Sequence, residues 1–166
     1  MLLDDALRGV ELVRPFAGPL VDVGSGGGTP GIPLAVALPD REVTLLEAGR
    51  RKADFLRRWT PELPNLRVVW GRAEEHVTDH YEVAVAKALA SPPVAAEWCL
   101  PLVRPGGAVL LWAGPSAERD RVARAAGLVG GELAETPDGF LLLRKLRPTP
   151  DRFPRRPGMA RKRPLA

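Results

Sequence analysis

The sequence contains a single cysteine, few aromatic residues and no long hydrophobic run. Cys99 cannot form a disulfide within the chain, and no set of cysteine and histidine residues has the spacing of a zinc site, so no metal is expected. No apolar stretch approaches the ~20 residues of a membrane-spanning helix. The acidic Asp4 and Asp5 come too early for a signal peptide. These absences predict a cytoplasmic protein that has no membrane partner.

The 166 residues suffice for one domain, and their charge is unevenly distributed. Residues 147–166 contain seven Lys or Arg and one Asp, a net charge of +6, whereas residues 1–146 have a net charge of −2. We therefore expect one domain over residues 1–146 and a basic, Pro- and Arg-rich tail over residues 147–166. Such a tail is typical of phosphate binding, but a merely solvated tail is an equal alternative.

Short apolar runs alternate with longer helical patterns, which is typical of βαβ units around a parallel sheet. The pattern predicts a doubly wound, Rossmann-like α/β fold with a seven-stranded sheet whose last two strands form a hairpin. The predicted strands are 20–23, 42–46, 67–70, 82–86, 108–112, 130–135 and 139–145, and the predicted helices are 30–38, 50–59, 93–103 and 116–126. Ligands of such sheets bind at the carboxyl ends of the strands.

A glycine-rich loop follows the first predicted strand, with four glycines among residues 24–28. Glycine lets the backbone turn sharply and approach a ligand without a Cβ clash. The next helix offers free N–H groups to polar ligand atoms. A tight structural turn is the alternative, but the position between a strand and a helix favours a cofactor loop.

Two cofactors compete for this loop. Gly26, Gly28 and Gly31 satisfy the G-x-G-x-x-G pattern of nicotinamide dinucleotide sites, with Glu47 at a distance suited to a ribose. Asp22, however, would repel a pyrophosphate and attract the cationic sulfonium and ammonium of S-adenosylmethionine. Glu74 adds an acid that could accept a hydrogen bond from an adenine amino group. The acids therefore favour S-adenosylmethionine.

Several segments resemble the RsmG (GidB) family, which methylates N7 of a guanine in the 530 loop of bacterial 16S ribosomal RNA. The first is DVGSGGGTPGIPL at residues 22–34, and it is followed by LLEAGRRKADFLR at 45–57, GRAEE at 71–75 and AKALAS at 86–91. The basic tail, PTPDRFPRRPGMARKRPL at 148–165, is similar to the terminal signature of the family. The resemblance implies a methyltransferase whose substrate partner is 16S ribosomal RNA or the small ribosomal subunit.

The resemblance also implies which residues contact the cofactor. They are Gly24 and Thr29 in the loop, Ala73 and Glu74 around the adenine, and Lys87, where the family usually has arginine; Asp22, Gly26 and Glu47 complete our predicted set. The family normally carries extra helices before its first strand, whereas only about 20 residues precede Asp22 here. Met1 stands where the family's H-x-x-D-S-L stretch has histidine.

Methylation of guanine N7 needs no general base, because N7 carries a lone pair and no proton at neutral pH. We therefore expect no catalytic residue, and we interpret His76, His80 and Cys99 as structural or surface residues. Rate acceleration would come from orientation of the two reactants.

The basic tail supplies the candidate RNA contacts Arg155, Arg156, Arg161 and Lys162. Three alternatives stay open: a nicotinamide-dependent oxidoreductase, an RNA-binding module that has lost turnover, and a methyltransferase of a small molecule or protein.

Overall fold

The computed structural model describes residues 2–114 and 118–166. Its centre is one seven-stranded sheet with the order β3-β2-β1-β4-β5-β7-β6. The first five strands pair in parallel, and β7 pairs antiparallel with both β5 and β6. The strands are β1 (Leu20–Val23), β2 (Val43–Glu47), β3 (Leu66–Trp70), β4 (Tyr81–Lys87), β5 (Val103–Trp112), β6 (Gly131–Ala134) and β7 (Phe140–Lys145). The predicted doubly wound fold and its terminal hairpin are confirmed.

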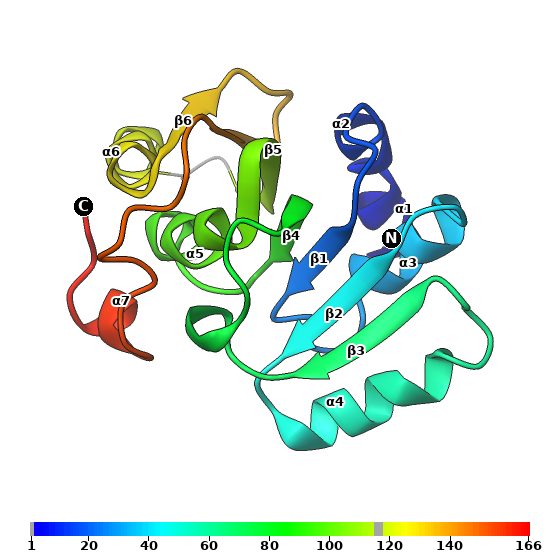
Figure 1. Cartoon of the computed structure of the whole chain (residues 1–166). Coiled ribbons are helices and arrows are strands. Elements are labelled where there is room, and N and C mark those ends of the chain that lie inside the picture. The colour runs from blue at the N-terminus through cyan, green and yellow to red at the C-terminus, as the bar shows by residue number, and fades with distance from the viewer. Residues whose placement is uncertain (1, 115–117) are drawn as a thin grey trace.

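Helices cover both faces of the sheet (Figure 1). They are α1 (Leu2–Leu7), α2 (Val10–Val13), α3 (Gly31–Ala37), α4 (Arg50–Leu56), α5 (Pro92–Cys99), α6 (Arg119–Val129) and α7 (Met159–Lys162), with short 3-10 turns at Arg57–Trp59, Ala73–Glu75 and Leu100–Leu102. None of the helices in the described ranges is long and apolar enough to cross a membrane.

Strand β1 shows why the sheet needs helices on both sides. All four of its residues are buried. Because successive side chains of a strand point to opposite faces, Val21 and Val23 join the hydrophobic cluster beneath α5 and α6, whereas Leu20 joins the cluster beneath α2 and α3. Three of its four residues are apolar, and such a short, mainly apolar run is typical of a strand that is buried on both faces, which is how it could be predicted from the sequence.

The ends of three helices differ from the prediction. The predicted helix 116–126 extends to Val129. The predicted helix 50–59 ends at Leu56 and continues as a 3-10 turn, and its aromatic residues Phe55 and Trp59 are exposed. The predicted helix 93–103 ends at Cys99, where Pro101 cannot donate the backbone hydrogen bond of a continuing α-helix. The predicted start of the helix 116–126 lies outside the described residues.

The basic tail folds back onto α5. Phe153 and Ala160 are buried in the cluster that contains α5 and α6, and α7 contacts α5. The side chain of Lys145 at the end of β7 is fully buried, where its Nζ donates to Asp79 Oδ1 (3.0 Å) and to Thr149 Oγ1 (2.8 Å). The tail therefore leaves the sheet in a fixed direction and brings residues 158–161 to the carboxyl edge of the sheet.

Candidate cofactor site

Two cavities adjoin at the carboxyl ends of β1, β2, β3 and β4. The first cavity, of about 280 Å³, has mostly apolar walls, and its lining residues are Val23, Gly24, Leu46, Ala48, Gly71, Arg72, Ala73, Glu74, Leu89, Trp98, Gly158 and Arg161. The second cavity, of about 590 Å³, is lined by Gly24, Ser25, Gly26, Gly27, Thr29, Glu47, Ala48, Lys52, Lys87, Ala88, Leu89 and Arg161. Seven of the eight predicted cofactor residues line one or both cavities, and Asp22 does not.

The glycine-rich loop forms part of the wall of both cavities. Gly24 has a φ of +70°, and a Cβ added there would lie 2.4 Å from Cδ1 of Leu89. Only glycine accommodates both the positive φ and this approach. The Gly24 N–H donates to the Leu46 carbonyl (2.8 Å), which holds the loop against the end of β2. The loop thus presents a backbone surface to any ligand in the cavities.

Glu47, the last residue of β2, fixes the shape of this loop. One carboxylate oxygen accepts the Gly26 N–H (2.8 Å), and the other accepts the Gly49 N–H (2.7 Å). The side chain is mostly buried yet lines the second cavity. Because each carboxylate oxygen has a second lone pair, Glu47 can hold the loop and also accept hydrogen bonds from ribose hydroxyls.

Asp22 lies behind the loop. Its side chain is 1% exposed, and Oδ2 accepts the N–H of Gly31 at the start of α3 (3.0 Å). Burial raises the pKa of this carboxyl to about 7. The expectation that Asp22 directly attracts a cationic cofactor is therefore corrected. The carboxylate faces the helix rather than the cavities, and at neutral pH it is partly protonated.

Ala73 and Glu74 form the 3-10 turn after β3 and line the first cavity. Glu74 Oε1 accepts the N–H of Gly158 from the tail (3.2 Å). Gly158 and Arg161 of the tail also line this cavity. Sequence reasoning assigned neither residue to the cofactor cavity, because no local pattern indicates that the tail returns to this edge.

Thr29 and Lys87 line the second cavity, as predicted. The Lys87 Nζ forms a short ion pair with Asp5 of α1. The Asp5 carbonyl also accepts the indole N–H of Trp112 at the end of β5 (2.9 Å). Asp5 was not predicted as a site residue, and in the stretch that resembles the N-terminal family motif it takes the place of the serine.

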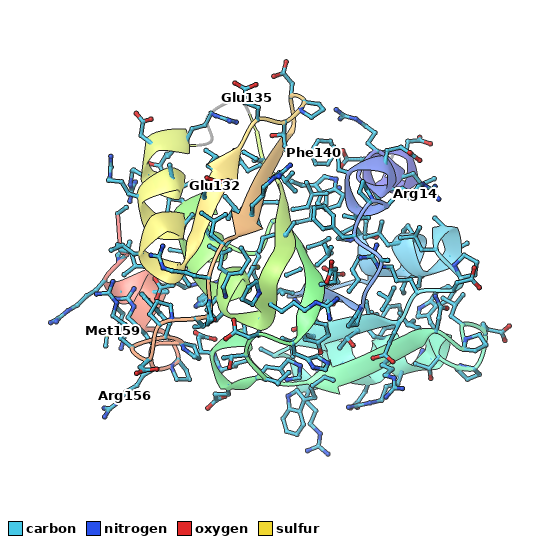
Figure 2. All side chains as sticks on the ribbon, turned by 45° about the horizontal axis from the view of Figure 1, so that its top comes forward. Arg14, Glu132, Glu135, Phe140, Arg156 and Met159 are labelled. Carbon is cyan, nitrogen blue, oxygen red and sulfur yellow. The ribbon has the colours of Figure 1, made fainter. Side chains whose placement is uncertain are left out.

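The four predicted RNA contacts have different environments. The Arg155 guanidinium donates to both carboxylate oxygens of Glu97, each at 2.5 Å, and Glu97 is buried. Arg155 therefore neutralises a buried carboxylate, and its contact with RNA stays a prediction. Arg156 and Lys162 are exposed, and Figure 2 shows the Arg156 side chain pointing away from the body of the protein. Arg161 borders both cavities.

Cys99 and His76 do not line either cavity. Cys99 is buried, and burial raises the pKa of its thiol. His76 lies in hydrogen-bond contact with the Tyr81 hydroxyl (2.8 Å), and burial lowers the pKa of its imidazole. Within the described residues, no group of His, Cys, Asp and Glu side chains could hold a metal ion.

Comparison of the sequence with protein families matches residues 1–129 to rRNA small subunit methyltransferase G, GidB. Ribosomal RNA small subunit methyltransferase G of Moorella thermoacetica is 36% identical over 99% of this chain and 76% of its own length. The protein of the same name from Pelotomaculum thermopropionicum is 40% identical over 88% of this chain and 69% of its own length.

Solved structures of low sequence identity share the fold. The 16S rRNA methyltransferase RsmC of T. thermophilus, in complex with AdoMet and guanosine, superposes with a TM-score of 0.61 at 19% identity, over 90% of this chain and 40% of that one. A predicted O-methyltransferase of Agrobacterium tumefaciens gives a TM-score of 0.68 at 19% identity, over 87% of this chain and 84% of that one. The fold is that of S-adenosylmethionine-dependent methyltransferases, and the chain belongs to the ribosomal RNA small subunit methyltransferase G (GidB) family.

Proposed function

We propose that this chain transfers the methyl group of S-adenosylmethionine to N7 of a guanine in the 530 loop of bacterial 16S ribosomal RNA. The observation that carries the proposal is the pair of adjoining cavities at the carboxyl edge of the sheet. The first has apolar walls and one carboxylate, which suits an adenine. The second joins the glycine-rich loop to Lys87 and Arg161, which suits the methionyl group and an incoming nucleotide. The choice of guanine N7 follows the family resemblance.

The side chains around the cavities fit this cofactor. Glu74 would accept the adenine amino group beside the Ala73 backbone, and Glu47 would accept the ribose hydroxyls. Gly24, Gly26, Thr29 and Lys87 line the second cavity and would contact the methionyl part. Asp22 contributes indirectly, because its hydrogen bond to Gly31 fixes the start of the helix that follows the loop.

The bound cofactor supplies an electrophilic methyl group on a sulfonium. The guanine N7 lone pair forms the new C–N bond while the C–S bond breaks and its electron pair stays on sulfur, so no proton is transferred. The residues of this chain have to hold N7 in line with that bond and exclude water, and such orientation can account for much of the rate acceleration. The site accordingly requires no general base.

The exposed cations of the tail supply the RNA contacts in this proposal. Arg156 and Lys162 face solvent, and Arg161 adjoins the cavities. Cations so placed would bind phosphates around a nucleotide that enters the second cavity. The partner is 16S ribosomal RNA, free or assembled in the small subunit, and the reaction is accordingly placed in the cytoplasm.

The proposal is tested by cofactor binding and methyl transfer on the same protein. Calorimetric titration is expected to show micromolar-range binding of S-adenosylmethionine and none of NADH. Glu74→Gln is expected to weaken that binding by up to about tenfold, because a neutral amide oxygen accepts a hydrogen bond more weakly than a carboxylate does. Labelled methyl groups should then appear in 16S ribosomal RNA transcribed in vitro or in unmethylated small subunits. Cofactor binding without transfer to either substrate would identify an RNA-binding module, and NADH binding would overturn the cofactor assignment.

A further inference from the structure

The short helix α7 belongs to the tail by sequence but to the cofactor site by position. Its first flanking residue, Gly158, and its third residue, Arg161, both line the first cavity. They face the residues that the proposed function assigns to adenine. A group that fills this cavity therefore touches the basic tail as well as the sheet.

Two contacts attach α7 to lining residues of the first cavity. The Gly158 N–H donates to Glu74 Oε1 (3.2 Å). The guanidinium of Arg161 lies over the ring of Trp98, 5.1 Å from its centroid, and Trp98 also lines the cavity. The indole N–H of Trp98 is buried and has no hydrogen-bond partner among the described residues. Both attachment points are thus surfaces that a bound adenine would also contact.

Arg161 makes a third contact, with the loop that follows β4. Its Nη2 donates to the Leu89 carbonyl (3.3 Å). Leu89 itself packs against Gly24, and the neighbouring Ala88 has a φ of +54°. A non-glycine residue in this conformation is uncommon and is held there by its surroundings. Arg161 therefore connects the glycine-rich loop, the loop after β4 and the shared wall of the two cavities.

We propose that Arg161 is a positioning residue through which cofactor binding strengthens RNA binding by the tail. This inference rests on the proposed function and states how binding of the cofactor affects binding of the RNA. With the cavity filled, α7 gains contacts that it lacks when the cavity holds water, so the cofactor favours the arrangement in which the tail is docked. A ligand shifts an equilibrium only by such differential contacts. The docked tail presents Arg161 at the mouth of the second cavity beside the exposed Lys162.

The coupling is measured as a ratio of RNA affinities. Binding of in-vitro transcribed 16S ribosomal RNA is measured by filter retention with and without saturating S-adenosylhomocysteine, which occupies the site but cannot donate a methyl group. The wild-type protein is expected to bind RNA about tenfold more tightly with this ligand, within the usual range of coupling between sites. By reciprocity, the RNA must tighten binding of S-adenosylhomocysteine by the same factor.

Matched variants separate coupling from charge. Arg161→Ala is expected to lower the ratio of RNA affinities with and without the ligand below about twofold. Arg161→Lys keeps the charge but loses the planar stacking group, so it is expected to give an intermediate ratio. Lys162→Ala removes the neighbouring exposed cation, so it is expected to weaken RNA binding equally with and without the ligand and to leave the ratio unchanged.

Two results would overturn the inference alone: a wild-type ratio of one with both ligands bound, or an unchanged ratio in Arg161→Ala. Both leave the proposed function intact, because each ligand still binds. Failure of the wild-type protein to bind either ligand by itself would instead overturn the proposed function and the inference together.

Discussion

The two ends of the chain reach the cofactor cavities from opposite faces of the sheet, and different ion pairs hold them there. At the N-terminal end, Asp5 of α1 pairs with Lys87, and the two side chains are 37% and 22% exposed. In the tail, Arg155 pairs with Glu97, and the two side chains are 22% and 3% exposed. An exposed pair contributes little stability, whereas breaking a buried pair leaves an uncompensated charge in the core.

The basic tail is therefore not a single functional surface. In the tail, one arginine neutralises a buried carboxylate, another borders the cofactor cavity, and a third is exposed to solvent. The three residues have the same charge and lie within seven positions of one another in the sequence. Their partners in the fold separate structural residues from candidate RNA contacts.

The buried pair gives the largest expected effect. Arg155→Ala leaves Glu97 buried without its cation, so we expect the free energy of unfolding to fall by about 3 kcal/mol. Arg156→Ala is the matched control at the adjacent exposed position, and its effect is expected to stay within about 0.5 kcal/mol. Urea unfolding of the two variants measures both values. Equal losses would contradict the distinction between an arginine that is paired with a buried carboxylate and an exposed arginine.

Asp22, unlike Glu97, is a buried carboxyl that has no paired cation among the described residues. Burial raises its pKa from 3.8 to about 7, so between these values the folded protein binds a proton that the unfolded chain releases. Its contribution to stability therefore falls as the pH rises through this window and stays constant above it. Asparagine does not titrate. The free energy of unfolding of Asp22→Asn, taken relative to that of the wild type, should therefore increase by about 3 kcal/mol from pH 5 to pH 8.

This pH effect is read as a difference between two proteins, because other carboxyl groups also titrate. Urea unfolding of wild type and Asp22→Asn at several pH values gives the difference directly. A difference that does not change with pH would show that Asp22 titrates normally in the folded protein.

The exposed pair gives a smaller effect. Asp5→Asn keeps the size of the side chain and removes the charge that faces Lys87, so we expect a loss of less than about 1 kcal/mol. The loss should decrease further in high salt, because mobile ions screen exposed charges. Thermal unfolding at low and high salt measures both effects. A loss as large as that of Arg155→Ala would show that the N-terminal segment is anchored as firmly as the tail.

The exposed cations should change RNA binding with almost no change in stability. Each of Arg156→Ala and Lys162→Ala is expected to reduce the slope of log affinity for RNA against log salt by about one. Filter binding at several salt concentrations measures these slopes. Unchanged slopes in both variants would remove the tail from the RNA interface.

The sequence predicted those parts of the fold that follow from local patterns. The buried strand at residues 20–23, the glycine-rich loop and the turn before the final strand each have a signature within a few residues. The same holds for Glu47 and Glu74, because parallel strands bring their carboxyl ends to one edge. The order of strands and loops along the chain is therefore enough to assign these two acids to the site.

Interactions between distant residues could not be predicted in this way. Arg155 and Glu97 are 58 positions apart, and Glu74 and Gly158 are 84 apart. Arg155 was predicted to contact RNA from its charge alone, as its neighbours were. Asp22 was predicted to contact the cofactor because it lies just before the glycine-rich loop. Their roles depend on which side of an element each side chain occupies and on what packs there, and no pattern in the sequence encodes the return of the tail to α5.

The identity of the methylated nucleoside tests the central claim most directly. In-vitro transcribed 16S ribosomal RNA and unmethylated small subunits would be incubated with the protein and S-adenosylmethionine carrying a deuterated methyl group. The RNA would then be digested to nucleosides and analysed by mass spectrometry. Our account predicts deuterated 7-methylguanosine at a single guanine in the 530 loop with at least one of the two substrates. Label on another atom or in another region of the RNA, or no label from a protein that binds the cofactor, would contradict it.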